Sequence, residues 1–236
     1  MENSDGLAGA LALVRERVSR AAQRAGRDPR EIVLVAASKA VPAERLRQAW
    51  GAGLTRFGEN RAQELKEKQA ALADLAVEWH FIGHLQRNKV KDVAGKVALL
   101  HSLDRWELAL DLERHLSALG RSQPVLVQVN SSGESSKSGV APGDALDFVR
   151  RVAGLPHLEV HGLMTIARLD PDPEQARHCF RLLRELRDQI AAAAIPGVRM
   201  EWLSMGMSGD FEVAVEEGAN LIRLGTAIFG PRPPRR

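Results

Sequence analysis

The sequence has 236 residues, of which 44% are hydrophobic and 27% are charged, and its formal net charge is +3. This length suits one large domain or two small ones, and so mild a charge argues against a nucleic-acid partner. No apolar run reaches the roughly 20 residues of a membrane span. The single cysteine excludes an intrachain disulfide and a cysteine-based zinc cluster, and the absence of tyrosine excludes a phenolic acid or base from this chain.

The predicted elements alternate between strands and helices. Helical spacing of apolar residues predicts a first helix over residues 7–25, and eight short apolar runs follow, each leading into a helix or turn. These runs are EIVLVAAS, TRFGEN, EWHFIG, KVALLHSL, PVLVQVN, LEVHGLMTI, VRMEWLSMG and NLIRLG. Eight strand–helix units predict an α/β fold, a single (β/α)₈ TIM barrel with an extra N-terminal helix. An open, doubly wound sheet is the alternative.

The ends of the chain carry few signals of their own. The N-terminus has no basic stretch before its apolar residues, so we expect no secretory signal and a cytoplasmic protein without a membrane partner. No linker or shift in composition divides the chain. We therefore expect one barrel domain over residues 1–230 and a disordered basic tail over 231–236.

Polar residues and glycines follow most of the predicted strands, and in a barrel these strand ends gather at the rim that carries the functional site. The rim positions are Lys39, Asn60, His80 to Gly83, Asn130, Met164-Thr165, Ser204 to Ser208 and Gly225-Thr226. Their convergence follows from the predicted fold and does not prove it independently.

The stretch LSMGMSGDFEVAVEEGANLIRLGTAIFG combines three features that suit a phosphate. Ser208 is expected to cap a helix whose free amides face an anion, and Gly225-Thr226 places further amides and a hydroxyl at the end of the last strand. Arg223 adds a buried cation between them. Each feature alone is more simply a turn or a core ion pair, but the combination favours a phosphate site.

Lys39 follows an apolar strand and lies on the same face as Val33, Val35 and Ala37. Such a lysine commonly reaches for solvent. Partly desolvated and near Arg223, however, its amine could lose its proton and attack a carbonyl. A lysine of this kind beside a phosphate site and a partner for a ring nitrogen describes a pyridoxal 5'-phosphate (PLP) site.

Six blocks resemble, in order, the YggS/PROSC family of PLP homeostasis proteins over nearly the whole chain, from about Val35 to Gly230. The blocks are VAASKAVP, RFGENRAQE, WHFIGHLQRNK, NSSGESSKSG, HGLMTIA and LSMGMSGDFEVAVEEGANLIRLGTAIFG. This family is similar to the N-terminal barrel domain of alanine racemase and lacks the second, β-rich domain of that enzyme.

The resemblance implies a set of cofactor contacts and no catalytic or metal-binding residue. The implied contacts are Lys39 as a Schiff base, Asn60 near the ring, Arg223 at the pyridine nitrogen, Ser208, Gly225 and Thr226 at the phosphate, and Ser204 as a further candidate for this shell. An arginine does not give up its proton, so it keeps the ring nitrogen unprotonated and weakens the electron sink.

These expectations favour a protein that buffers PLP and delivers it to apo-enzymes, without efficient catalysis and with indirect effects on amino-acid and keto-acid pools. In the racemase, the resemblance implies, the second acid/base is a tyrosine of the absent domain. The racemase-like dimer also needs that domain, so we expect a monomer. The alternative is a PLP-dependent amino-acid racemase of narrow substrate range.

Three further features carry weaker expectations. His80 and His84 are four residues apart, but a strand end would turn them in different directions and no third ligand is evident, so we expect no metal. The basic segment 87–96 is more simply a solvated face than a nucleic-acid site. Lys137, in the loop NSSGESSKSG, is a candidate for transient handling of the cofactor.

Overall fold

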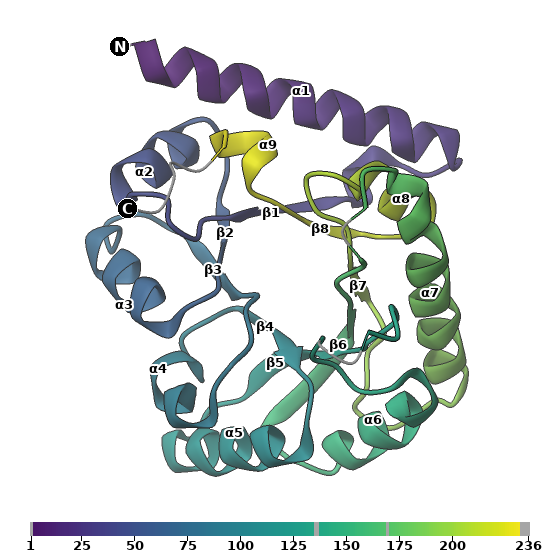
Figure 1. Ribbon diagram of the computed structural model, residues 1–236. Coiled ribbons are helices and arrows are strands. Elements are labelled where there is room, and N and C mark those ends of the chain that lie inside the picture. The colour runs from purple at the N-terminus through teal and green to yellow at the C-terminus, as the bar shows by residue number, and fades with distance from the viewer. Residues whose placement is uncertain (1, 135–136, 169, 232–236) are drawn as a thin grey trace.

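The strands form a closed parallel barrel at the centre of the protein (Figure 1). The computed structural model describes residues 2–134, 137–168 and 170–231. Each strand pairs with the next, and β8 pairs with β1 to close the barrel. The described strands are β1 (Val33–Ala37), β2 (Arg56–Glu59), β3 (Glu78–Phe81), β4 (Leu99–Leu103), β5 (Gln123–Gln128), β6 (Leu158–Met164), β7 (Trp202–Ser204) and β8 (Leu221–Leu224). The predicted (β/α)₈ barrel is confirmed, and the open sheet is wrong.

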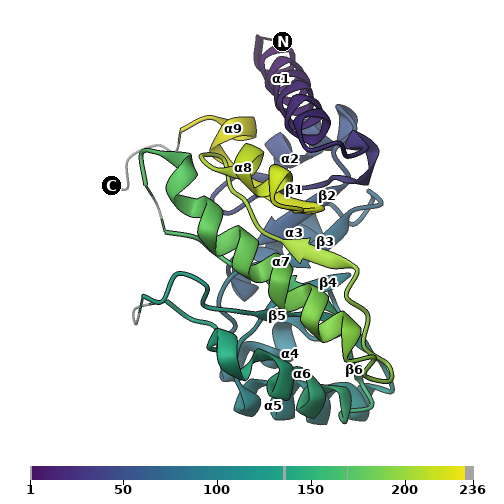
Figure 2. The same cartoon turned by 90° about the vertical axis from the view of Figure 1, so that its right-hand side faces the viewer.

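Helices surround the barrel, and α1 lies across its outside against α8 and α9 (Figures 1 and 2). The described α-helices are α1 (Glu2–Arg24), α2 (Ala43–Gly51), α3 (Ala62–Ala71), α4 (Val90–Val93), α5 (Trp106–Leu119), α6 (Ala145–Ala153), α7 (Arg177–Ala192), α8 (Phe211–Glu216) and α9 (Thr226–Phe229). Short 3₁₀ helices are η1 (Pro29–Glu31), η2 (Arg87–Lys89), η3 (Pro142–Asp144) and η4 (Pro173–Ala176). None of the helices in the described ranges has the length and apolar character needed to cross a bilayer. Of the predicted tail, residues 232–236 lie outside the described residues.

Alternation along each strand separates the barrel interior from the shell beneath the helices. In β1, Val35 belongs to the inner cluster, whereas Ala36 belongs to the large core between strands and helices. The inner cluster is Val35, Leu99, Leu126, Met164 and Leu221, with Val33, Ile166 and Trp202 packed against it. Most of this apolar cluster lies near the starts of the strands, and at the carboxyl end of β6 it extends to Met164 and, two residues beyond the strand, to Ile166.

Polar side chains form the next layer of the interior. His101, Ser204 and Arg223 follow Leu99, Trp202 and Leu221 by two residues on their strands, so they face the same way one step nearer the rim. All three polar residues are buried. Because buried polar groups need hydrogen-bond partners, this layer must satisfy itself within the barrel.

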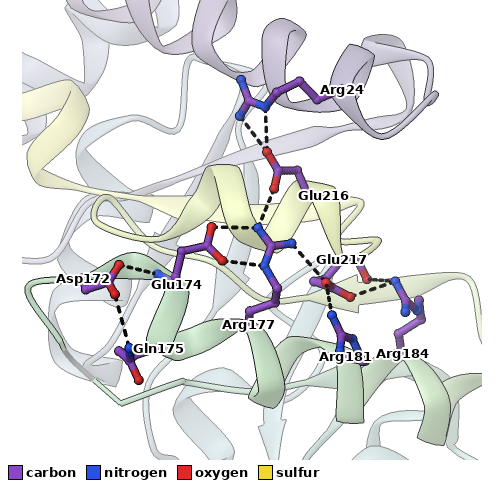
Figure 3. Close-up of polar contacts among 9 residues, drawn as sticks. All are labelled: Arg24, Asp172, Glu174, Gln175, Arg177, Arg181, Arg184, Glu216 and Glu217. Atoms are coloured by element: carbon purple, nitrogen blue, oxygen red, sulfur yellow. Dashed lines mark hydrogen bonds and ion pairs between the residues drawn. The ribbon is translucent and has the colours of Figure 1, made fainter.

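An ion-pair cluster holds the outer helices α1, α7 and α8 together (Figure 3). Arg177 of α7 contacts Glu174, Glu216 and Glu217, with nitrogen–oxygen distances of 2.6, 2.7 and 3.0 Å. Arg24 of α1 reaches Glu216 at 2.7 Å. The cluster therefore connects α1 to α7 and to the C-terminal end of α8.

Candidate functional site

The seven predicted cofactor contacts come from four consecutive strands of the barrel, β7, β8, β1 and β2. Lys39 lies two residues beyond β1, and Asn60 lies one residue beyond β2. Arg223 pairs in register with Val35, so the Lys39 turn lies further toward the rim than the guanidinium's strand position. The fold therefore brings the predicted residues to one sector of the rim.

A buried ion pair contacts the turn that carries Lys39 and fixes its backbone. Lys68 of α3 contacts Glu59 of β2 at 2.6 Å, and its Nζ also donates to the Ser38 carbonyl oxygen at 2.7 Å. The Ser38 hydroxyl donates to Glu59 Oε1 at 2.6 Å. Burial raises the pKa of Glu59, although hydrogen bonds from Lys68 and Ser38 oppose that rise. One lysine thus holds the residue that precedes Lys39.

The residue after Lys39 is held as well. Ala40 has a φ of 60°, in the left-handed region that costs a residue with a side chain about 1 kcal/mol. Its backbone amide donates to Glu64 Oε2 at 2.9 Å, and Glu64 in turn lies 3.2 Å from Lys68 Nζ. Lys39, which is half-buried, therefore projects from a turn fixed on both sides.

Arg223 lies beneath the rim and is 4% exposed. Its Nη1 donates to Ser204 Oγ at 2.6 Å, and its Nη2 donates to the carbonyl oxygen of Thr165 at 2.8 Å. Burial lowers the pKa of Arg223 to about 10, and the Asp210 carboxylate opposes that fall. The guanidinium consequently keeps its charge at neutral pH and has further N–H groups beyond these two contacts.

Two histidines continue the polar layer below Arg223. The sequence did not single out His101, and it placed His80 at the rim, whereas the His80 side chain is buried between His101 and Glu78. Ser204 Oγ lies 2.9 Å from His101 Nδ1, and His101 Nε2 lies 2.8 Å from His80 Nδ1. Burial, together with His80 and Arg223, holds the pKa of His101 well below its usual value. A histidine placed two residues after a leucine in the apolar run KVALLHSL was the signal available in the sequence.

The phosphate candidates Ser208 and Gly225 come together. The Ser208 hydroxyl accepts from the backbone amides of Gly225 at 3.3 Å and Ala227 at 3.2 Å. Two amides therefore converge on one oxygen, which is how backbone groups bind a phosphate oxygen. Thr226 begins α9 and is exposed.

The predicted cap of the preceding helix is wrong by two residues. The N-cap of α8 is Asp210, and its carboxylate accepts from the Met207 amide at 2.6 Å, so Ser208 lies in the turn before the helix. Gly206 makes this turn possible, since its φ is 92° and a Cβ there would lie 2.6 Å from the Ala214 Cβ. The shift frees the Ser208 hydroxyl to meet the amides after β8.

Asn60 and Lys137 line a cavity of about 170 Å³ at the rim. The Oδ1 of Asn60 is buried and has no hydrogen-bond partner within the described residues. Gly83 packs against the Asn60 backbone, where a Cβ would lie 2.4 Å from the carbonyl oxygen. Lys137 forms an ion pair with Glu134. This part of the rim therefore offers an amide oxygen that awaits a donor.

His80 and His84 contact different partners. His80 bonds to His101 inside the barrel, whereas His84 Nδ1 lies 3.2 Å from Asp104 on the rim. Among the described residues, no group of three or more His, Cys, Asp or Glu side chains is placed to hold a metal ion.

Fold and rim together define a barrel of the alanine racemase type, with an amine, a buried guanidinium and converging amides in one sector. A family model described as alanine racemase, N-terminal domain, matches residues 10–233. The chain is 47% identical over 222 residues to a protein of Aquifex aeolicus named pyridoxal phosphate homeostasis protein, covering 94% of this chain and 96% of that protein. The chain belongs to the family of pyridoxal phosphate homeostasis proteins, which confirms the resemblance inferred from the six blocks.

Two solved structures place this result in context. PipY of Synechococcus elongatus, in a structure with PLP bound, has a TM-score of 0.82 and 35% identity, covering 95% of this chain and all of that one. Alanine racemase of Clostridium difficile has a TM-score of 0.75 at 14% identity, covering 98% of this chain and 58% of the racemase. The racemase shares the fold, and the chain spans little more than half of its length.

Proposed function

We propose that this protein binds PLP on Lys39 at the carboxyl rim of its barrel and acts in the homeostasis of that cofactor inside the cell. The observation that carries the proposal is the charged guanidinium of Arg223, buried beneath the rim in the same sector as Lys39 and the Gly225 amide. The names of the relatives and the PLP bound to PipY support it.

The residues present fit the chemistry of PLP. When bound, PLP supplies an aldehyde that condenses with an amine and a pyridine ring that withdraws electrons. Lys39 offers the amine from a turn whose backbone is held on both sides. The Ser208 hydroxyl, which accepts from the amides of Gly225 and Ala227, has its own hydrogen to donate to a phosphate, and the orphaned Asn60 Oδ1 offers an acceptor. Together these residues would hold the polar groups of PLP.

Arg223 sets what the bound cofactor can do. A guanidinium with a pKa of about 10 would donate a hydrogen bond to the ring nitrogen of bound PLP without transferring its proton there at neutral pH. A ring left unprotonated would withdraw electrons weakly. Arg223 therefore disfavours rapid turnover of amino acids at this site.

The composition of the chain points the same way. A racemase needs an acid/base on each face of the substrate, and these 236 residues contain no tyrosine to act as a phenolic one. Exchange of the α-proton of free amino acids in deuterated water, followed by NMR, separates a carrier from a racemase. Exchange at an ordinary turnover rate, about 10 s⁻¹, would replace our proposal with an amino-acid racemase of narrow range.

The proposal extends to how the protein works in the cell. Residues 1–230 form one PLP-binding domain that acts as a cytoplasmic monomer and passes the cofactor to apo-enzymes of PLP. Light scattering tests the monomer, and recovery of activity by a purified apo-aminotransferase tests delivery. Delivery requires faster recovery with the loaded protein than with the same concentration of free PLP.

Lys137 is proposed to handle the cofactor during transfer. It lines the same cavity as Asn60, and its ion pair with Glu134 keeps the side chain close to the rim. Lys137→Ala should slow delivery to the apo-enzyme while leaving the adduct on Lys39 intact. An unchanged rate of delivery would show that Lys137 takes no part in the transfer.

A further inference from the structure

A continuous chain of hydrogen bonds crosses the barrel interior from Arg223 to Glu78. The successive donor–acceptor distances are 2.6 Å to Ser204, 2.9 Å on to His101, 2.8 Å on to His80 and 3.2 Å on to Glu78. The step between Ser204 and His101 joins β7 to β4, which are not neighbours in the barrel. The chain therefore runs through the interior and does not follow the wall.

Two ends of this hydrogen-bond chain have a fixed direction: arginine has only donors, so Ser204 Oγ accepts from Arg223, and an ionised Glu78 carboxylate only accepts. We assign the Ser204 hydroxyl as the donor to His101 Nδ1, because His80, which donates to Glu78 through Nε2, then accepts at Nδ1 from His101 Nε2. A neutral His101 then carries its hydrogen on Nε2 and donates to His80 Nδ1. His80 in turn donates through Nε2 to the Glu78 carboxylate, which only accepts when ionised. All four bonds point away from Arg223.

The last residue of this hydrogen-bond chain, Glu78, lies at the mouth of the barrel opposite the rim that carries Lys39. Glu78 is the first residue of β3, its side chain is 41% exposed, and Arg56 at the start of β2 lies 2.9 Å from it. Both line a cavity of about 320 Å³ at that mouth, together with His80. The hydrogen bond from His80, ahead of the charge of Arg56, holds the pKa of Glu78 below its usual value. The chain thus ends on a carboxylate that stays ionised.

We propose that His101 and His80 are positioning residues for the cofactor, which act through Ser204 to fix the guanidinium of Arg223 against the ring nitrogen. This inference rests on the proposed function, because it assigns a partner to that guanidinium. In this arrangement the two histidines would act on the cofactor through Ser204 and Arg223.

The physical benefit is preorganisation. The bonds from Arg223 to Ser204 and to the Thr165 carbonyl fix two corners of the guanidinium, so its remaining N–H groups have one orientation toward the rim. Hydrogen bonds that donate in one direction and end on an anion polarise one another and strengthen the chain. Without His101, Ser204 keeps its hydroxyl but loses the acceptor that fixes its hydrogen.

The first test uses the protein before any cofactor is added. Imidazole ¹⁵N chemical shifts of ¹⁵N-histidine-labelled protein report which ring nitrogen carries hydrogen. We expect His101 and His80 each to carry hydrogen on Nε2 and to accept a hydrogen bond at Nδ1. Hydrogen on Nδ1 of His101, or on both of its nitrogens, would reverse the chain and overturn the proposal.

The second test compares three variants loaded with PLP. Ser204→Ala removes the link next to Arg223, and His101→Phe breaks the chain one step further away. Ser102→Ala is the matched control, since Ser102 is equally buried beside His101 but its hydroxyl has no hydrogen-bond partner within the described residues. All three are read out by apparent affinity for PLP and by the ¹⁵N shift of labelled PLP at its ring nitrogen.

The expected pattern separates positioning from folding. Ser204→Ala and His101→Phe should each weaken PLP binding about three- to tenfold, the loss of one hydrogen bond, and both should move the ring-nitrogen resonance in the same direction. Ser102→Ala should match the wild type in both readouts. If the two chain variants instead behave like Ser102→Ala, the histidines do not position Arg223. If no variant, wild type included, binds PLP, the proposed function fails while the tautomer result stands.

Discussion

The protein contains two networks of charged side chains, and they differ in how far solvent reaches their contacts. Beneath the rim, the hydrogen bonds from Arg223 through Ser204 and His101 to His80 and the Lys68–Glu59 pair are buried, and only the terminal Glu78 is partly exposed. On the outside, Arg177 is shared among three carboxylates, and Glu217 receives Arg177, Arg181 and Arg184 within 3.1 Å (Figure 3). The inner contacts are shielded from water, whereas the arginines of the outer network are partly exposed.

The difference predicts where the molecule is vulnerable. A buried charge that loses its partner has no water to replace it, so each inner contact matters. An outer charge retains other partners and solvent, and salt screens its contacts, since the Debye length falls to about 3 Å at 1 M salt. We therefore expect large effects from single changes inside and small ones outside, in the following order.

Removing Lys68 should have the largest effect on stability. Lys68→Met leaves Glu59 buried without its cation and releases the Ser38 carbonyl, so we expect a loss of about 3–5 kcal/mol in the free energy of unfolding. Urea titration measures it. Lys66→Met, at an exposed position of the same helix, is the control. A loss no greater than that of the control would mean that the buried pair contributes nothing.

His101 should make stability depend on pH. Its pKa is lowered in the folded state, so below about pH 6.5 the unfolded chain binds more protons and unfolding is favoured as the pH falls. The slope is at most about 1.4 kcal/mol per pH unit. His101→Phe should remove this acid sensitivity between pH 7 and 5, and Ser102→Ala should keep it. Parallel pH profiles for wild type and His101→Phe would contradict the assignment.

Glu217 contacts three arginines of the outer network, and its loss should have a moderate effect. Burial disfavours its charge, but hydrogen bonds from Arg181 and Arg177 outweigh burial and lower its pKa. Glu217→Gln should cost about 1–2 kcal/mol, and the cost should shrink in 1 M NaCl. The cost of Lys68→Met should not shrink under the same conditions. If Glu217→Gln and Lys68→Met showed equal salt dependence, the inner and outer contacts would not differ in their screening by salt.

Arg181 should have the smallest effect. Its side chain is 52% exposed, and Glu217 keeps Arg177 and Arg184 when Arg181 is removed. Arg181→Ala should leave the urea midpoint unchanged within experimental error. A clear loss of stability would show that the outer network is not redundant.

The sequence predicted what depends on local pattern. Eight apolar runs, each followed by a helix or turn, were enough for the barrel, and polar residues one or two positions past a strand, such as Lys39 and Asn60, were found at the rim. Arg223 stood out because it is charged within an apolar strand. These features depend on neighbouring residues in the sequence, and the two-residue period of a strand determines on which side of it each residue lies.

The partners of these residues could not be predicted in the same way. His101 and Ser204 are 103 positions apart and lie on strands that are not adjacent, so no spacing along the chain relates them. The Lys68–Glu59 pair depends on how α3 packs on β2. The N-cap of α8 is Asp210 and not the predicted Ser208, because the turn that begins at Gly206 includes Ser208. Applying the two-residue period of strands to β4 would still have placed His101 in the interior.

The central claim is that Lys39 holds PLP at this rim, and covalent mapping tests it most directly. Wild-type protein and Lys39→Ala are incubated with PLP, reduced with borohydride, digested and analysed by peptide mass spectrometry. We expect a single pyridoxyl-phosphate adduct on the Lys39 peptide of the wild type, with no adduct at other lysines and none in the variant. An adduct confined to another lysine, such as Lys137, or no adduct on the wild type would contradict the account.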